Sequence, residues 1–197
     1  MFGINFKKIF IMIVGLILLI AVCYILYRCI FIHDDRIIVK AEDGNWYNVR
    51  NTPDKQISAN ALARLNKKIN TLLANLDPEQ YPQHKSAILR LKSRYAGKIS
   101  EGVIDKKLTS YTVNKGEQIV FCIRSRDPQD TLYSDNILFY VGLHELAHVA
   151  SISSSVHEHN DEFYDNFDFL KQKAIQLGLF TEQRNVVNYC GIMMEAV

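Results

Sequence analysis

The sequence predicts an α+β fold in which helices pack on a small antiparallel sheet and one transmembrane helix precedes them. Three observations predict it: an apolar run near the N-terminus, β-type runs around tight-turn residues, and longer segments with apolar residues at helical spacing. Of the 197 residues, 48% are hydrophobic and 22% are charged, a composition typical of a globular protein. A chain of this length is too short for a multidomain enzyme. We expect an anchor at 1–33, a juxtamembrane hairpin or linker at 34–50 and a domain at 51–197.

The first element is an apolar run from Ile9 to Tyr27, which has Lys7 and Lys8 before it and Arg28 after it. As a helix, its 19 residues span roughly 28 Å, close to the thickness of a bilayer's hydrocarbon core. The run is longer than the apolar part of a cleaved signal peptide, and no small-x-small cleavage site follows it. We therefore expect an uncleaved single-pass anchor in a membrane. Basic residues flank it on both sides, so they leave the orientation open.

The next elements are a hairpin and two helices. Residues 37–50 form two β-type runs around Asp43-Gly44, a dipeptide typical of tight turns. Apolar residues then follow helical spacing as far as Leu76, and Thr52-Pro53 has the form of an N-cap followed by a proline. A second helix is expected over about 83–95, and its outer face carries a basic stripe. The stripe consists of Lys85, Arg90, Lys92 and Arg94.

The rest of the chain adds another hairpin and two more helices. We expect strands at 110–113 and 118–123, a helix from Ser134 or Asp135 to about Ala150, and a last helix from about Asn160 to Gly178. Four cysteines are too few for a disulfide-built scaffold. Cys122 and Cys190, which lie outside the apolar run, can pair or stay reduced.

The helix that ends at Ala150 contains His144-Glu145-Leu146-Ala147-His148, the pattern His-Glu-x-x-His. Positions i and i+4 lie about 40° apart around a helix, so both imidazoles can bind one Zn²⁺. Glu145 lies about 100° around the helix from His144, so its carboxylate can contact the metal-bound water and need not bind the metal itself. The pattern arises by chance in a chain of this length on the order of one time in two hundred. The sequence therefore predicts His144 and His148 as zinc ligands and Glu145 as the catalytic base.

A catalytic zinc takes three protein ligands, so one more residue is needed. Metzincin spacing is excluded, because Ser151 and Ser154 stand where that class has glycine and histidine. We favour His159, because it directly precedes the expected N-cap of the last helix and Phe163 would pin that helix below the site. The alternatives are His157, Glu158, Glu162, Glu182 and Glu195.

At these positions the chain resembles the WLM/SprT-like zinc metallopeptidases. His144-Glu-Leu-Ala-His148 followed by His159-Asn-Asp-Glu-Phe163 is similar to that family's His-Glu-x-x-His and His-x-x-x-Phe or Trp. The likeness covers about 50–191, and segments 110–124 and 188–191 resemble a subgroup found in large DNA viruses and algae. It implies a zincin-like fold, zinc bound by His144, His148 and His159, and Glu145 as the catalytic base. Two features depart from the family. The spacer between His148 and His159 holds ten residues, which is longer than is common in the family. The family's better-known members are soluble proteases of DNA-crosslinked proteins, whereas this chain has an expected anchor.

We therefore expect a membrane-anchored, zinc-dependent metallopeptidase that hydrolyses protein or peptide substrates. The strand at 118–123 or its partner would pair with an extended substrate, and Tyr189 or Tyr140 would serve as an oxyanion donor. One alternative is a membrane-tethered, zinc-stabilised binding module without turnover, although a structural zinc site has no use for Glu145. Another is a DNA-associated protease that binds nucleic acid through the basic helix at 85–98.

Overall fold

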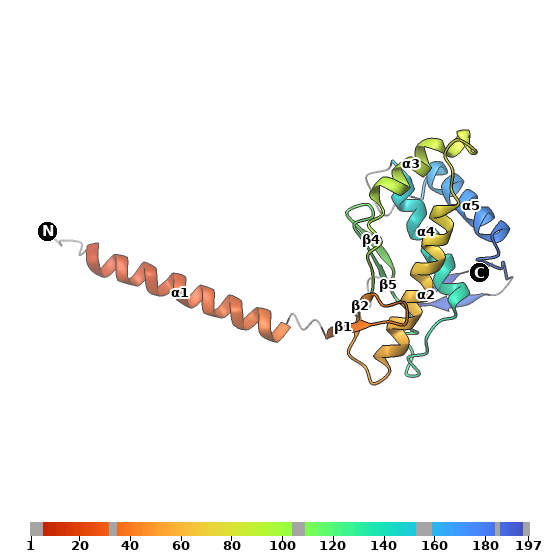
Figure 1. Cartoon of the computed structure of the whole chain (residues 1–197). Coiled ribbons are helices and arrows are strands. Elements are labelled where there is room, and N and C mark those ends of the chain that lie inside the picture. The colour runs from red at the N-terminus through yellow and green to blue at the C-terminus, as the bar shows by residue number, and fades with distance from the viewer. Residues whose placement is uncertain (1–5, 32–34, 104–108, 153–158, 184–185, 195–197) are drawn as a thin grey trace. The chain divides into compact units, whose positions relative to one another are not determined.

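The structure, a computed structural model, describes residues 6–31, 35–103, 109–152, 159–183 and 186–194. Two compact units are present, residues 1–35 and residues 36–197. The first contains α1 (Phe6–Phe31), the red helix in Figure 1. Within α1, the segment Ile9–Leu26 is long and apolar enough to cross a membrane, and no other described helix is. A signal sequence would meet the same criteria of length and composition.

The second unit is built on a five-stranded sheet. Its strands, in spatial order, are β1 (Arg36–Lys40), β2 (Trp46–Arg50), β3 (Ile99–Glu101), β5 (Gln118–Phe121) and β4 (Tyr111–Val113). The pairs β1–β2 and β4–β5 are antiparallel hairpins, as the sequence predicts. β3 pairs parallel to both β2 and β5, so the sheet is mixed. The parallel pairing arises because the chain returns from β2 to β3 through helices, whereas a tight turn would reverse its direction.

Helices complete the domain and confirm the α+β class. They are α2 (Lys55–Ala74), the short 3₁₀ helix η1 (Pro82–His84), α3 (Lys85–Arg94), α4 (Asp135–Ala150) and α5 (Asp161–Gln176). α4 is the central helix, since it packs against α2, α3, α5 and β4 (Figure 1). Gly142 of α4 faces α2, because a Cβ there would lie 3.4 Å from Cδ1 of Leu65, in van der Waals contact. The helix with the His-Glu-x-x-His pattern is thus fixed from several sides.

The start of α2 differs from the expectation that Thr52 would cap it. The helix begins at Lys55, and its N-cap residue is Asp54, whose side chain makes no capping hydrogen bond. Asp54 Oδ2 instead accepts a hydrogen bond of 2.6 Å from Nη2 of the buried Arg124. The carboxylate of Asp54 therefore forms a tertiary ion pair with Arg124 in place of a local capping hydrogen bond.

A second, two-stranded sheet closes the described chain. β6 (Val187–Tyr189) and β7 (Ile192–Met194) form a hairpin around Cys190 and Gly191, both of which have positive φ. A disulfide joins Cys190 to Cys122, 68 residues earlier and just after β5. The two cysteines that the sequence leaves open are thus paired, and the pairing fixes this hairpin to the main sheet.

Candidate metal centre and active site

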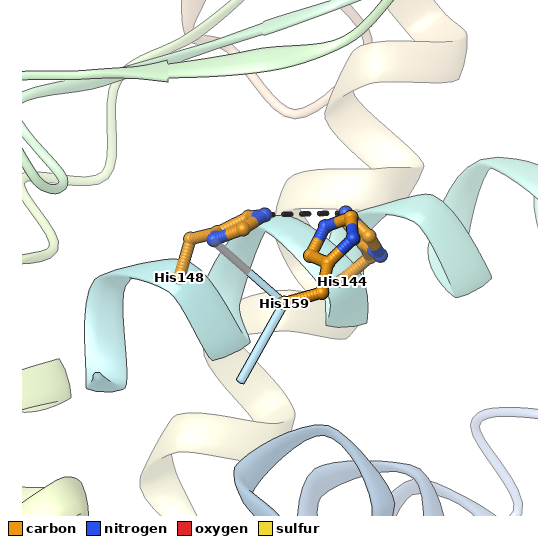
Figure 2. Close-up of side chains that lie close together, drawn as sticks. All are labelled: His144, His148 and His159. Carbon is orange, nitrogen blue, oxygen red and sulfur yellow. Dashed lines mark hydrogen bonds between the residues drawn. The ribbon is translucent and has the colours of Figure 1, made fainter. Parts of the chain in front are cut away.

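The first two candidate ligands are placed by a well-capped helix. The side chain of Ser134 accepts a hydrogen bond from the backbone N–H of Ile137, and Asp135 lies in the first turn of α4. Ten residues further on, the helix presents His144 and His148 on one face. Their Nε2 atoms lie 3.2 Å apart (Figure 2).

The third candidate, His159, comes from the start of the next helix. The side chain of Asn160 caps α5 by accepting a hydrogen bond of 2.9 Å from the backbone N–H of Phe163. This cap fixes where the chain enters α5 and brings the preceding His159 to the other two histidines. One ring nitrogen from each of the three lies within 4.8 Å of the other two, and Figure 2 shows the three rings facing one another.

Phe163 forms the base of the histidine cluster. Its ring is buried, and its centroid lies 4.9, 4.4 and 4.5 Å from those of His144, His148 and His159. An aromatic ring in contact with all three imidazoles restricts their orientations, which lowers the conformational entropy that ligand binding would cost. The sequence predicts a role for Phe163 in pinning α5, and the structure adds these direct contacts with the rings.

The donor set fits a zinc ion. Tetrahedral zinc with Zn–N bonds of about 2.0–2.1 Å places its ligand nitrogens roughly 3.3 Å apart. The distance between the Nε2 atoms of His144 and His148, 3.2 Å, is close to that value. Burial, followed by the charges of His148 and His159, lowers the pKa of His144 to about 3. His144 is therefore neutral at physiological pH, the state in which an imidazole nitrogen can bind a metal.

Glu145 follows His144 directly in the sequence, and its side chain is buried and directed towards the sheet. Its carboxylate accepts a hydrogen bond of 2.8 Å from Oγ1 of Thr112 on β4. Burial raises the pKa of Glu145 to about 7, and the bond from Thr112 works in the opposite direction. A carboxyl with a pKa near 7 can both take and return a proton at neutral pH.

The alternative third ligands are placed differently. Oε1 of Glu162 accepts a hydrogen bond of 2.7 Å from Arg90, and its Oε2 accepts one of 3.0 Å from the backbone N–H of Ile152. Glu182 pairs with Lys171 at 3.5 Å. Both glutamates therefore have partners outside the histidine cluster. His157, Glu158 and Glu195 lie outside the described residues.

Two arginines of the predicted basic stripe hold the end of the motif helix. Arg90 donates to the carbonyl of Ala150 at 2.7 Å, and Arg94 donates to the carbonyls of Val149 and Ser151 at 3.0 and 2.9 Å. These carbonyls lie at the negative end of α4, where cations are favourable. Because Arg90 also pairs with Glu162, it links the end of α4 to the start of α5. We name Arg90 and Glu162 the interhelix clamp.

The two tyrosines considered as oxyanion donors have different surroundings. Tyr140 packs against the rings of Phe167 and Phe180. The hydroxyl of Tyr189 lies 2.7 Å from Oγ of Ser110, the residue directly before β4. Burial, with a smaller contribution from the charge of Glu145, raises the pKa of Tyr189. Of these two tyrosines, Tyr189 is the one whose pKa the charge of Glu145 helps to raise.

Sequence reasoning missed Thr112, Ser110 and the interhelix clamp. Thr112 meets Glu145 across 33 residues and Arg90 meets Glu162 across 72. Contacts of such separation leave no periodic or capping signal in the sequence. Side chains alternate along β4, and this alternation places Thr112 on the inward face. It is the feature of the sequence that comes nearest to indicating the role of Thr112.

Solved structures of Wss1 are similar to this chain. The match to Wss1 from Saccharomyces cerevisiae has a TM-score of 0.49 and 20% identity, and covers 66% of this chain and 90% of the other. A mutant Wss1 from S. pombe matches with a TM-score of 0.42 and 20% identity over 64% of this chain and 92% of the other. Likenesses at these TM-scores assign no function to the chain.

Sequence relatives come from large DNA viruses. No protein-family model matches the chain. A stretch of 83 residues is 40% identical to the uncharacterized protein 136R of Invertebrate iridescent virus 6, covering 41% of this chain and 44% of that protein. A longer match, 32% identical over 155 residues, covers 76% of this chain and 77% of the uncharacterized protein R325 of Acanthamoeba polyphaga mimivirus. At that identity and coverage, the chain belongs to the same protein family as R325 of mimivirus.

Proposed function

We propose that this protein is a membrane-anchored, zinc-dependent metallopeptidase. The observation that carries the proposal is the meeting of three imidazoles, from His144, His148 and His159, within 4.8 Å on and beside a helix that also holds the buried Glu145. Three imidazole nitrogen donors leave one position of a tetrahedral zinc site for chemistry, which is the arrangement of catalytic zinc sites. A zinc ion bound there would polarise the substrate carbonyl and make water acidic enough to attack near neutral pH.

Glu145 would handle the proton in this reaction. Its carboxylate accepts a proton from the attacking water and passes that proton to the nitrogen of the departing amine. A pKa near 7 suits both steps, because neither protonation state is strongly favoured at neutral pH. Thr112 keeps the carboxylate oriented from β4. A purely structural zinc site has no need for this arrangement, so Glu145 favours turnover over the binding module.

The sheet offers a position for an extended substrate. Of the two strands considered from the sequence, β5 lies between β3 and β4 and has no open edge. β4 is the last strand of the sheet as far as the described residues show, and it packs against α4. Its outer edge can therefore hydrogen-bond to a substrate's main chain, a mode of recognition that tolerates varied side chains.

The proposal includes residues 9–27 as the membrane anchor, on the strength of the length and composition of α1. It does not include nucleic-acid binding. Arg90 and Arg94, two of the four cations of the basic stripe, donate to backbone carbonyls inside the domain, and Lys85 pairs with Glu79 at 2.6 Å. Side chains engaged in this way do not favour a nucleic-acid interface.

The test combines metal content with peptide hydrolysis on the full chain in detergent. We expect about one zinc per chain in the wild type, and we expect its loss in His159→Ala but not in His84→Gln, a histidine outside the cluster. Glu145→Gln should retain zinc while hydrolysis falls by about 10²- to 10⁴-fold, and the exposed control Glu117→Gln should keep both. Hydrolysis that survives in Glu145→Gln would sink the mechanism. Zinc without hydrolysis in the wild type would favour the binding module.

A further inference from the structure

On one face of the β1–β2 hairpin, the domain leaves the part nearest the turn uncovered; at the other end of that face Arg50 is buried. Ile38 and Trp46 are 65% and 66% exposed, among the most exposed large apolar side chains of the second unit. In the antiparallel register Ile38 lies opposite Asn48 and Lys40 opposite Trp46. Opposite residues of such a pair project to the same side. These four residues, Ile38, Lys40, Trp46 and Asn48, therefore share one side of the hairpin, which we name the outer hairpin face.

The other side of the hairpin is already occupied. Tyr47 and Val49 are buried, and β1 and β2 pack against α2. The carboxylates near the turn are also engaged with the domain: Asp43 accepts from the hydroxyl of Tyr47 at 2.7 Å, and Glu42 pairs with Arg64 at 3.8 Å. The outer hairpin face thus presents an indole, an aliphatic side chain and an ammonium group, and the acidic groups of the turn, Glu42 and Asp43, are bonded elsewhere.

Chain connectivity keeps the start of β1, and with it the hairpin, within reach of a bilayer, given that α1 spans one as proposed above. Helix α1 ends at Phe31 and β1 begins at Arg36, so five Cα–Cα steps separate them. They reach at most roughly 18 Å. The headgroup layer on each side of the hydrocarbon core is itself on the order of 6 Å thick. A surface tethered so closely meets the membrane at a high effective concentration, so even a weak affinity for lipid keeps it bound.

The chemistry of the outer hairpin face matches that layer. Tryptophan is enriched at the level of lipid headgroups, because its ring is apolar and its N–H is polar. Lysine can keep its ammonium among phosphates while its methylenes lie along apolar surface. We propose that the outer hairpin face lies in the headgroup layer of the membrane that α1 crosses. The domain would then touch the bilayer at a second place, which restricts its rotation about the anchor and holds the candidate active site in one orientation to the membrane.

Trp46 makes this proposal directly measurable, because it is the single tryptophan of the chain. The full chain is reconstituted in phosphatidylcholine vesicles that contain phosphatidylglycerol, with and without lipids brominated on their acyl chains. We expect the Trp46 emission to shift to shorter wavelength relative to an exposed indole, and bromolipids to quench on the order of half of it. Bromines near the headgroup end of the acyl chain should quench more strongly than bromines near its methyl end. Ile38→Asp should move the emission back to longer wavelength.

The matched control moves the indole to another exposed position. In Trp46→Phe/Leu89→Trp the only tryptophan lies on α3, at a site that is 49% exposed and at the other end of the domain from β1 (Figure 1). Its emission should remain that of an exposed indole, and bromolipids should leave it unchanged. This control separates contact with lipid from quenching by mere proximity to a vesicle.

Three outcomes would overturn the proposal. If the vesicles retain the protein after carbonate washing but bromolipids leave the Trp46 emission unchanged, the anchor stands and the contact of the outer hairpin face with lipid is refuted. A blue-shifted, unquenched emission that depends on protein concentration would mean that a second copy covers the face. Release of the protein by carbonate would remove the anchor together with this surface. The first two results leave the anchor and the zinc and Glu145 measurements intact, whereas release by carbonate also removes the anchor from the proposed function; the peptidase part is tested separately by zinc content and by Glu145→Gln.

Discussion

Glu145 offers a test in which catalysis and stability move in opposite directions. The residue is 4% exposed, and burial raises its pKa from 4.5 to about 7. The folded protein therefore holds this proton more tightly than the unfolded chain does. The stability that the neutral carboxyl contributes is present in full below about pH 4.5 and is lost as the pH rises through about 7. Since one pKa unit corresponds to about 1.4 kcal/mol, ionising Glu145 in the metal-free protein costs about 3 kcal/mol of stability.

Glutamine at this position removes the ionisation and keeps the shape. Its amide oxygen can still accept the hydrogen bond from Thr112. We expect metal-free Glu145→Gln to lie within about 1 kcal/mol of the wild type near pH 5 and to be more stable than it near pH 8, by about 3 kcal/mol. For a domain of this size, 1 kcal/mol moves Tm by about 2–4 °C. The expected gain in Tm near pH 8 is therefore about 6–12 °C.

The assay is thermal unfolding followed by near-ultraviolet circular dichroism, on both full-length proteins in the same detergent with a chelator. The difference between variant and wild type at each pH cancels groups that titrate alike in both. One such group is His144, whose lowered pKa destabilises the metal-free fold in acid. Glu117→Gln, an exposed control, should show no difference at either pH. Equal Tm differences near pH 5 and pH 8 for Glu145→Gln would refute the argument from burial.

The same variant should lose peptide hydrolysis, as set out for the proposed function. Residues kept for catalysis often cost stability, and a substitution that stabilises the fold while it abolishes turnover is typical of such residues. A more stable Glu145→Gln that still hydrolyses peptides would mean that this buried carboxyl has no catalytic part. The two measurements together therefore separate a functional acid from a merely buried one.

Three further predictions concern the residues that support the site. Thr112→Val removes the hydrogen bond that lowers the pKa of Glu145, so the acidic limb of the pH–activity profile should move to higher pH; an unchanged limb would contradict the assigned bond. Arg90→Ala breaks the interhelix clamp and should weaken zinc binding by about 10- to 100-fold in a metal titration, whereas Lys92→Ala on the same helix should not. Cys190→Ser opens a loop of 68 residues and should cost about 4 kcal/mol by the loop-entropy model. Reductant should lower the Tm of the wild type and leave that of Cys190→Ser unchanged.

The sequence predicts best where the determinants are local. Ser134 and Asn160 cap α4 and α5 as their sequence positions indicate, and apolar spacing identifies both helices. β3 escapes prediction because three residues are too few to show alternation, and its parallel partners come from distant parts of the chain. The sheet therefore differs from the antiparallel one expected, although the α+β class is the same.

The candidate site shows the same division. The pattern His-Glu-x-x-His and the cap after His159 are local features, and they lead to the three histidines that the structure brings together. The side chains that support them depend on tertiary contacts. Arg90 and Arg94 read as a solvated or nucleic-acid-binding stripe from the sequence, because helical periodicity does not reveal that the end of α4 lies beside them.

The position of His159 leads to a last prediction, about the segment 153–158 between the two helices. The chain before this segment is held at Ile152, whose N–H donates to Glu162, and the chain after it is held by the Asn160 cap. Since the interhelix clamp ties Glu162 to the end of α4, described residues outside the segment hold both of its ends.

Replacing 153–158 with glycine and serine at the same length should therefore leave zinc content near one per chain and hydrolysis largely intact. The same replacement removes His157, the rival third ligand, so it also decides between the two histidines. The comparison is the same replacement made together with His159→Ala, which should bind no zinc at all. Loss of zinc from the glycine and serine version alone would mean that the segment supplies a ligand, and the geometry argued from the helix caps would then be wrong.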